Sequence, residues 1–161
     1  MNNRGISPVI ATVIIVAVAI AIAIAVAFWM TGIVGLFTGF EELQISSAYA
    51  DTLNNNDQFV IHLQVKNTGT SAATIDNIFI NGRPFDDTTF EIKYGKSTGQ
   101  LTEDLLPNGT ISVSPGSTVY IDITFDVGAD WGDGKLGHGV SVEVKLHTAS
   151  GKEYPKLIVL P

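Results

Sequence analysis

Four side chains that could bind a cation lie close together around one glycine-rich stretch. They are three carboxylates and one imidazole: Asp126, Asp130, Asp133 and His138. A hard cation such as Ca²⁺ requires several converging oxygen ligands, and the spacing here does not match an EF-hand loop. A solvated loop over residues 128–139 is therefore the favoured interpretation, with a structural calcium site as the alternative.

Other residues with the types needed for catalysis or cofactor binding lack the required partners. The sequence Gly95-Lys96-Ser97-Thr98 is similar to the end of a phosphate-binding loop, but Phe90 stands where that loop needs its first glycine. His62 and His147 fall on outward positions of predicted strands, without metal-binding spacing. No nucleophile elbow occurs in the sequence. The sequence thus predicts no enzyme, no cofactor, and no catalytic or metal-ligating residue.

Three further features could belong to a functional surface. The adjacent acidic residues Glu41 and Glu42 point apart on a strand, so they are interpreted as solvated rather than as a catalytic pair. Trp131 is interpreted as a lid on one end of the fold, in preference to an exposed contact residue. Asn108 begins the only N-glycosylation triplet, in a predicted turn, so it is a candidate glycosylation site; a plain Asn-Gly turn is the alternative.

The charged residues divide the 161-residue chain into two unlike parts. Residues 5–40 carry no charged side chain, whereas residues 41–161 hold all sixteen acidic residues and eight of the nine basic ones. The net charge of −7 argues against the clustered basic face that nucleic-acid binding needs, so no nucleic-acid partner is expected. The absence of cysteine excludes disulfides, thiol nucleophiles and cysteine-ligated metals.

The uncharged part has the length and composition of a membrane-crossing helix. Residues 9–30 are apolar except for Thr12, and as a helix they would extend about 33 Å, enough for a hydrocarbon core of about 30 Å. Residues 19–27 alternate with the period of a strand, but a lone strand would leave its backbone unpaired in lipid, so a helix is predicted.

This helix has no polar side, so it must be surrounded by lipid or by copies of itself. Gly35 and Gly39 have small-xxx-small spacing, which fits either a packing face or a loosened exit from the membrane. The helix-core packing positions predicted from the sequence are Ile10, Ile14, Val18, Ile22, Val26, Gly35 and Gly39.

A short basic leader and a Ser-Pro pair precede the apolar segment, in the order Arg4-Gly5-Ile6-Ser7-Pro8-Val9-Ile10-Ala11-Thr12-Val13. This sequence resembles the N-terminus of archaeal type IV pilins. The resemblance implies a leader peptide over residues 1–5, with Arg4 as its charge, and cleavage between Gly5 and Ile6 by a prepilin peptidase. Ile10 occupies the position where bacterial type IV pilins usually carry a glutamate, which favours the archaeal branch. The archaellins share this processing and are the nearest alternative.

The same resemblance implies how the chain is organised and what it contacts. A hydrophobic membrane and filament-core helix would occupy residues 6–40, with the N-terminus in the cytoplasm and the larger part outside. The expected partners are other copies of the chain in a helical filament, the membrane before assembly, the prepilin peptidase, and the pilus assembly platform with its ATPase. The expected location is the cell surface, and the usual role of the family is adhesion.

Residues 41–161 have the pattern of an all-β domain. The clearest alternation of apolar and polar residues occurs at 119–127, and Asn81-Gly82 is a strong hairpin signal. The other predicted strands lie at about 43–49, 59–66, 78–80, 90–94, 140–146 and 154–160. Seven or eight strands with frequent turns predict an immunoglobulin-like sandwich. The expected fold class is therefore α+β, with a long hydrophobic N-terminal helix followed by an all-β sandwich head.

Taken together, the sequence favours a structural pilin that polymerises through its N-terminal helix into an archaeal type IV pilus on the cell surface. The alternative is an extracellular immunoglobulin-like binding module, tethered by an uncleaved signal anchor. An envelope enzyme is the weakest hypothesis, because no converging nucleophile, base or metal set is apparent.

Overall fold

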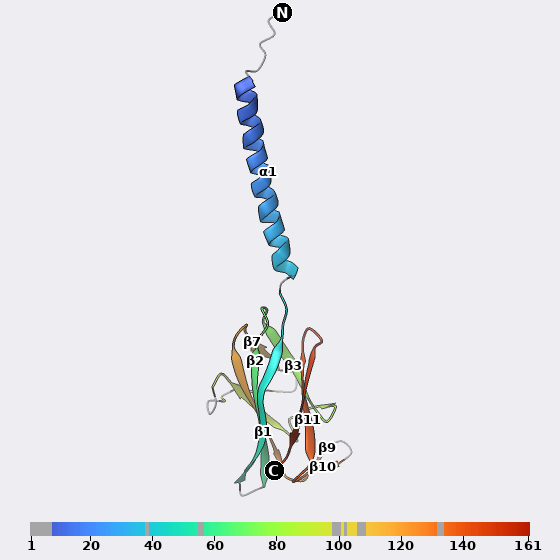
Figure 1. Ribbon diagram of the computed structural model, residues 1–161. Coiled ribbons are helices and arrows are strands. Elements are labelled where there is room, and N and C mark those ends of the chain that lie inside the picture. Colours follow the sequence, from blue (N-terminus) through green and yellow to red (C-terminus); the bar gives the residue numbers. More distant parts are fainter. Residues whose placement is uncertain are drawn as a thin grey trace, which may run out of the picture. The chain divides into compact units, whose positions relative to one another are not determined.

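The computed structural model describes residues 8–37, 39–54, 57–97, 101, 103–105, 109–131 and 134–161. The chain forms two compact units, Met1–Gly39 and Phe40–Pro161. The first unit contains one helix, and the second is a β-domain that we call the head (Figure 1). The division between the units lies one residue before the boundary that the charged residues indicate.

The helix α1 extends over Pro8–Phe37. Pro8 suits the first turn, because its missing N–H would have no partner within the helix there. The helix satisfies its own backbone despite the strand-like alternation of residues 19–27, so the helix prediction is confirmed. Gly32 and Gly35 lie inside α1 and Gly39 follows its end. The helix therefore continues through the first two glycines.

Within its described residues, the head contains two antiparallel sheets of five strands each, packed face to face around an apolar core (Figure 1). The first sheet has the order β1-β2-β8-β5-β6, the second contains β12, β11, β3, β4 and β7, and β9 pairs with β10 alone. The predicted class, an apolar helix followed by a β-sandwich, is confirmed. The strands are β1 (Leu43–Leu53), β2 (Gln58–Asn67), β3 (Ala73–Ile80), β4 (Arg83–Pro84), β5 (Glu91–Gly95), β6 (Glu103–Asp104), β7 (Ile111–Val113), β8 (Thr118–Asp126), β9 (Ala129–Trp131), β10 (Gly134–Leu136), β11 (Ser141–Thr148) and β12 (Glu153–Val159).

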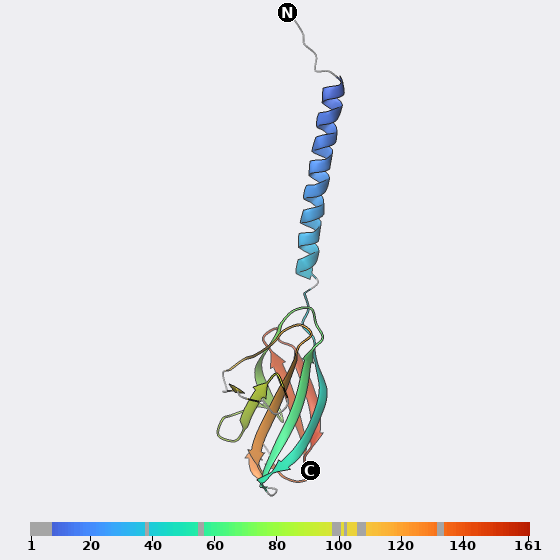
Figure 2. The same ribbon diagram turned by 90° about the vertical axis from the view of Figure 1, so that its left-hand side faces the viewer.

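Alternating burial in the long strands builds the core. In β8 the odd-numbered residues 119–125 are buried and the even-numbered residues face outward, as expected. β2 pairs with both β1 and β8, and Figure 2 shows these three strands running side by side along the head. The rings of Phe59 and Phe90 lie 5.7 and 5.4 Å from the ring of Phe125, so aromatic contacts join the strands inside the sandwich.

Trp131 is a lid on one end of the core. Its side chain is 9% exposed, its Nε1–H donates to the carbonyl oxygen of Ile80 at 2.7 Å, and its ring meets that of Phe90 edge-on at 4.7 Å. The lid interpretation is therefore confirmed. The expected solvated loop over residues 128–139 is wrong in part, because β9 and β10 form a hairpin within it. The hairpin carries Trp131 onto the core.

The turn between β3 and β4 confirms the predicted hairpin. Asn81 and Gly82 have φ values of 51° and 77°, the left-handed conformation that a two-residue type I′ turn requires. The side chain of Asn81 also accepts a hydrogen bond from the backbone N–H of Glu143 at 2.9 Å. This contact ties the turn to β11.

β1 changes its inward face at a β-bulge. Its register with β2 shifts between Ile45 and Ser47. Before the bulge Ile45 packs on the core, and beyond the bulge Ala48 and Ala50 do so. Tyr49 therefore lies on the outer face of the first sheet, where its side chain is 51% exposed.

Candidate functional site: the apolar helix and the clamp at the start of the head

The surface of α1 is apolar on every side. The segment Pro8–Ile33 has a mean hydropathy of 3.2 and is, by length and composition, able to cross a membrane. Its two hydroxyl groups, on Thr12 and Thr31, donate to carbonyl oxygens of the preceding turn at 2.9 and 3.0 Å. Both hydroxyls are thus satisfied within the helix, and neither needs water or a neighbouring chain.

Five of the predicted packing residues on α1 are accessible in the single chain. The side chains of Ile10, Ile14, Val18, Ile22 and Val26 are 49–58% exposed. Each is four residues from the next, so the set advances about 40° per step and sweeps about 160° of the helix surface. One straight neighbouring helix covers less than that, so full burial requires lipid or more than one neighbour. Packing at these positions, and at Gly35 and Gly39, stays a prediction.

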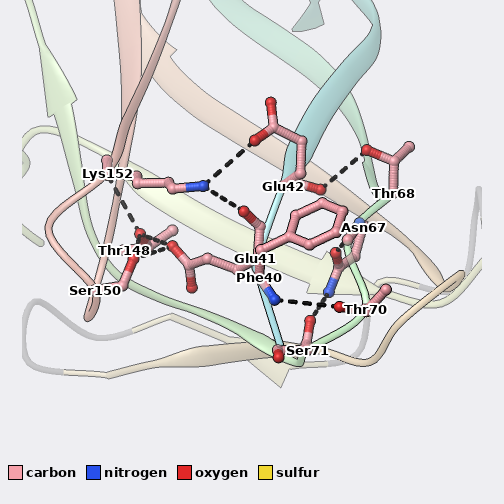
Figure 3. Close-up of polar contacts among 11 residues, drawn as sticks. Phe40, Glu41, Glu42, Asn67, Thr68, Thr70, Ser71, Thr148, Ser150 and Lys152 are labelled. Atoms are coloured by element: carbon pink, nitrogen blue, oxygen red, sulfur yellow. Dashed lines mark hydrogen bonds and ion pairs between the residues drawn. The ribbon is translucent and has the colours of Figure 1, made fainter. Parts of the chain in front are cut away.

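The first residues of the head are hydrogen-bonded to the turn between β2 and β3 (Figure 3). The carbonyl oxygen of Phe40 accepts from the backbone N–H groups of Thr70 and Ser71, at 2.9 and 3.0 Å. The N–H of Phe40 donates to Thr70 Oγ1 at 3.1 Å. The carbonyl oxygen of Glu42 accepts from the N–H of Thr68 at 2.8 Å. This segment is therefore fixed to the turn through its backbone at both of its ends.

Glu41, between them, holds the turn that joins β11 and β12. Its Oε1 accepts from Thr148 Oγ1 at 2.5 Å and from the hydroxyl of Ser150. Lys152 Nζ donates to the carbonyl oxygen of Glu41 at 2.5 Å and lies 3.4 Å from Glu42 Oε2. Thr148 is fully buried, so the Glu41 carboxylate satisfies a hydroxyl that water does not reach. The solvated interpretation is therefore wrong for Glu41.

We call residues 40–42, 67–71 and 148–152 together the clamp. In the described part of the head, the polar residues that are fully buried are Asn67 and Thr148, and both belong to the clamp. The Nδ2 of Asn67 donates to the carbonyl oxygens of Ser71 and Val113, at 2.8 Å each, and its Oδ1 accepts from the N–H of Gly69 at 2.9 Å. The clamp thus connects the start of the head to both sheets.

Removing the Glu41 carboxylate is expected to destabilise the head. Glu41→Ala leaves the buried Thr148 hydroxyl without its short charged acceptor, which costs about 1–2 kcal/mol of unfolding free energy. Glu42→Ala is the matched control, because it removes only an exposed ion pair at 3.4 Å and is expected to cost less than about 0.5 kcal/mol. Urea unfolding of the full chain in detergent measures both values. Equal values for the two variants would contradict the role given to Glu41.

Within the described residues, side chains of the acidic cluster found in the sequence have separate partners. Asp126 Oδ1 accepts from Gln58 Nε2 at 2.9 Å, whereas His138 Nδ1 contacts the carbonyl oxygen of Pro161. Among the described residues, no three His, Cys, Asp or Glu side chains are grouped to hold a metal ion. Asp133 lies outside these residues, so the calcium alternative stays a prediction.

Two histidine–aspartate pairs on the outer faces were not found by sequence reasoning. His62 Nδ1 lies 2.7 Å from Asp122 Oδ1 on the first sheet, and His147 Nδ1 lies 2.6 Å from Asp76 Oδ1 on the second. Both histidines are outward-facing, as predicted. The signal that could have revealed the first pair is the alternation of β2 and β8, which places His62 opposite Asp122.

Four of the predicted site residues lie outside the described residues. They are Arg4, Gly5, Ile6 and Asn108. Cleavage after Gly5 and glycosylation of Asn108 therefore stay predictions.

No protein-family model matches the chain, and neither does any of the curated proteins compared with it. Several solved structures are distantly similar. The Iho670 flagellar-like filament is 16% identical over 96% of this chain and 98% of its own, with a TM-score of 0.38. The archaeal flagellum of Methanospirillum hungatei strain JF1 is 15% identical over 94% and 88%, with a TM-score of 0.41. The archaellum periplasmic stator protein FlaG from Sulfolobus acidocaldarius is 17% identical over 73% and 99%, with a TM-score of 0.38. At these values the similarities do not assign the chain to a family.

Proposed function

We propose that this chain is a pilin: the subunit of an archaeal type IV pilus that functions in adhesion at the cell surface. The observation that carries the proposal is the pairing of the Arg4–Val13 sequence with a 30-residue helix that is apolar on every side. A simple membrane anchor needs neither the five-residue leader nor a helix that extends beyond the hydrocarbon core. The helix is about 45 Å long at 1.5 Å per residue.

The proposed pathway uses the same helix twice. A prepilin peptidase removes residues 1–5, and α1 holds the mature chain in the membrane with the head outside. The assembly platform and its ATPase then transfer the chain into a filament, where copies of α1 replace lipid around one another. Such contacts must be heterologous, because only head-to-tail association produces an open helical polymer. The wide apolar surface of α1 supports this arrangement, since it can contact several neighbours at once.

In such a filament, the clamp would distribute tension within the head. Tension between subunits would reach the head through Phe40, the first residue of the second unit. The backbone bonds of Phe40 and Glu42 pass it to the β2–β3 turn, and the side chain of Glu41 passes it to the β11–β12 turn. A pull at Phe40 would thus be shared by both sheets, and β1 would not be the first strand to detach.

Mass spectrometry of the N-terminal peptide, taken from sheared cell-surface material, tests the proposal. A chain that begins at Ile6 and sediments as filaments is the expected result. A chain that begins at Met1 and is found only in the membrane fraction would instead identify the tethered binding module.

Replacing Gly5 with a bulky residue is expected to block processing. Gly5→Leu places a branched side chain at the predicted cleavage site, so full-length precursor should accumulate in the membrane and filaments should be absent. The matched control is Gly32→Ala, since a Cβ at Gly32 meets no atom within 4 Å and the leader is untouched. Anti-head immunoblots that resolve the five-residue difference measure both. Unchanged processing of Gly5→Leu would show that the site is assigned wrongly.

A further inference from the structure

The outer face of the first sheet carries two neighbouring rows of polar and aromatic side chains. The register of β1, β2 and β8 places Tyr49, His62 and Asp122 in one row, and Ser47, Gln64 and Tyr120 in the next. Together with Leu63 and Leu101, these six residues line a cavity of about 300 Å³. The row of Tyr120 ends opposite Gly95, which contributes no side chain there. The polar and aromatic lining of the cavity therefore follows from the strand register together with the β-bulge that turns Tyr49 outward.

Contacts within the first row hold its side chains in fixed orientations. His62 Nδ1 lies 2.7 Å from Asp122 Oδ1, and the two side chains are 28% and 25% exposed. The ring of Tyr49 covers the His62 ring, with centroids 4.8 Å apart and planes inclined by 34°. When the neutral imidazole donates its Nδ1–H to Asp122, its Nε2 is left as an acceptor. A partly buried, ordered set of this kind is what a small-molecule site requires.

We infer that this cavity binds a neutral sugar residue. The rings of Tyr49 and Tyr120 offer flat apolar surfaces for the C–H face of a pyranose. The other four side chains supply both donors and acceptors for sugar hydroxyls, which act in both roles themselves. The cavity volume lies at the lower end of the range for small-molecule pockets, about 300–1,000 Å³, as suits one ring rather than a long oligosaccharide. The inference requires only the folded head and holds whether or not the chain polymerises.

The charges beside the cavity favour a neutral ligand over an organic cation. Asp122 already faces His62, and across β8 and β5 it lies opposite Lys93. Lys93 donates a side-chain hydrogen bond to Glu91 at 2.5 Å, which raises the pKa of Lys93 and pairs its charge. A positively charged ligand would therefore have to share the Asp122 carboxylate with His62.

Saturation-transfer NMR on the full chain tests the inference. The protein is purified in a polyoxyethylene detergent, which has no sugar headgroup, and is mixed with the methyl pyranosides of glucose, mannose, galactose and N-acetylglucosamine at up to about 10 mM each. Transfer to at least one glycoside is expected. Tyr49→Ala removes the aromatic surface and Asp122→Asn removes the charged acceptor, and each is expected to weaken the affinity about tenfold.

The second histidine–aspartate pair supplies a matched control. His147 and Asp76 make the same contact at 2.6 Å on the other sheet, away from the cavity. Asp76→Asn is therefore expected to keep the affinity of the unmodified chain. Absence of transfer to every glycoside, or an equal loss in Asp76→Asn, would overturn the inference. Binding of choline chloride without any sugar binding would overturn it too, in favour of a cation site.

Discussion

Replacing Ile22 with Asp is expected to abolish filament assembly while leaving the chain in the membrane. Ile22 lies in the middle of α1, and its side chain is 58% exposed in the single chain. A carboxylate at the centre of a membrane helix costs about 2.5–3.5 kcal/mol, which the many Ile and Val residues around it offset at about 0.3–0.6 kcal/mol each. Insertion into the membrane therefore survives.

In filament assembly, no comparable free-energy gain offsets the cost of the carboxylate. In a bundle of α1 helices every copy would bury one carboxylate, and no side chain from residue 5 to 40 is positively charged. The α-amino group that cleavage would leave on Ile6 would lie about 24 Å away at the rise per residue of a helix. A buried unpaired charge costs several kcal/mol per subunit, and the cost recurs at every step of polymerisation. Lipid allows the carboxylate to approach water by local thinning, whereas a packed bundle of helices does not.

Shearing cells and comparing the pelleted filament fraction with the membrane fraction measures this effect. Ile22→Leu is the matched control, because it keeps size and apolarity and is expected to yield filaments in normal amounts. Normal filaments from Ile22→Asp would show that α1 does not form the filament core. Loss of the Asp variant from the membrane as well would mean that insertion, not assembly, fails.

The parts of the fold that sequence reasoning predicted correctly depend on neighbours along the chain. The helix followed from the backbone demands of a long apolar segment, although residues 19–27 alternate like a strand. β8 was predicted from its alternation of apolar and polar residues, because one face of the strand is buried and the other is not. The hairpin at Asn81-Gly82 followed from a two-residue turn that few other residue pairs can adopt.

The clamp was missed because its contacts join distant parts of the sequence. Glu41 and Thr148 are 107 residues apart. The residues next to Glu41 and Glu42 in the sequence therefore give no sign of the buried partner, and the pair is interpreted as solvated. Asn67 directly follows the predicted strand at 59–66, and nothing in that pattern marks it as a buried residue with three side-chain hydrogen bonds. Two of those bonds, from the N–H of Gly69 and to the carbonyl oxygen of Ser71, are local, so the Asn-x-Gly spacing did hold a partial signal.

The cavity on the first sheet was missed for a different reason. A strict alternation from Leu43 and Ile45 would place Tyr49 on the inner face of β1. The β-bulge inserts one residue and moves Tyr49 to the outer face, beside His62. The residues around Ser46 carry no strong signature of a bulge. The position of the Tyr49 ring therefore depends on how β1 pairs with β2, which the sequence of β1 alone does not reveal.

The second large effect is expected at Gly69, where substitution by Ala should destabilise the head by about 2–3 kcal/mol. A Cβ on Gly69 would lie 2.6 Å from the backbone nitrogen of Glu42, 2.9 Å from Cα of Glu41, and closer still to the carbonyl oxygen of Phe40. These are backbone atoms and cannot rotate away as the end of a side chain can. The clash therefore separates the turn from residues 40–42 and breaks the bonds that Thr68, Thr70 and Ser71 make there.

A second glycine separates the effect of the close backbone contact at Gly69 from the general effect of replacing glycine. Gly137 is the matched control, because its added Cβ meets no atom within 4 Å and its backbone is not left-handed. Gly137→Ala is expected to leave stability unchanged or to raise it by less than about 1 kcal/mol, by restricting the unfolded chain. Urea unfolding of the full chain in detergent, followed by near-ultraviolet circular dichroism, compares the two. If both variants unfold at the same urea concentration, the start of the head does not lie against the β2–β3 turn. A loss confined to Gly69→Ala would establish the clamp as the contact that fixes residues 40–42 to the sandwich.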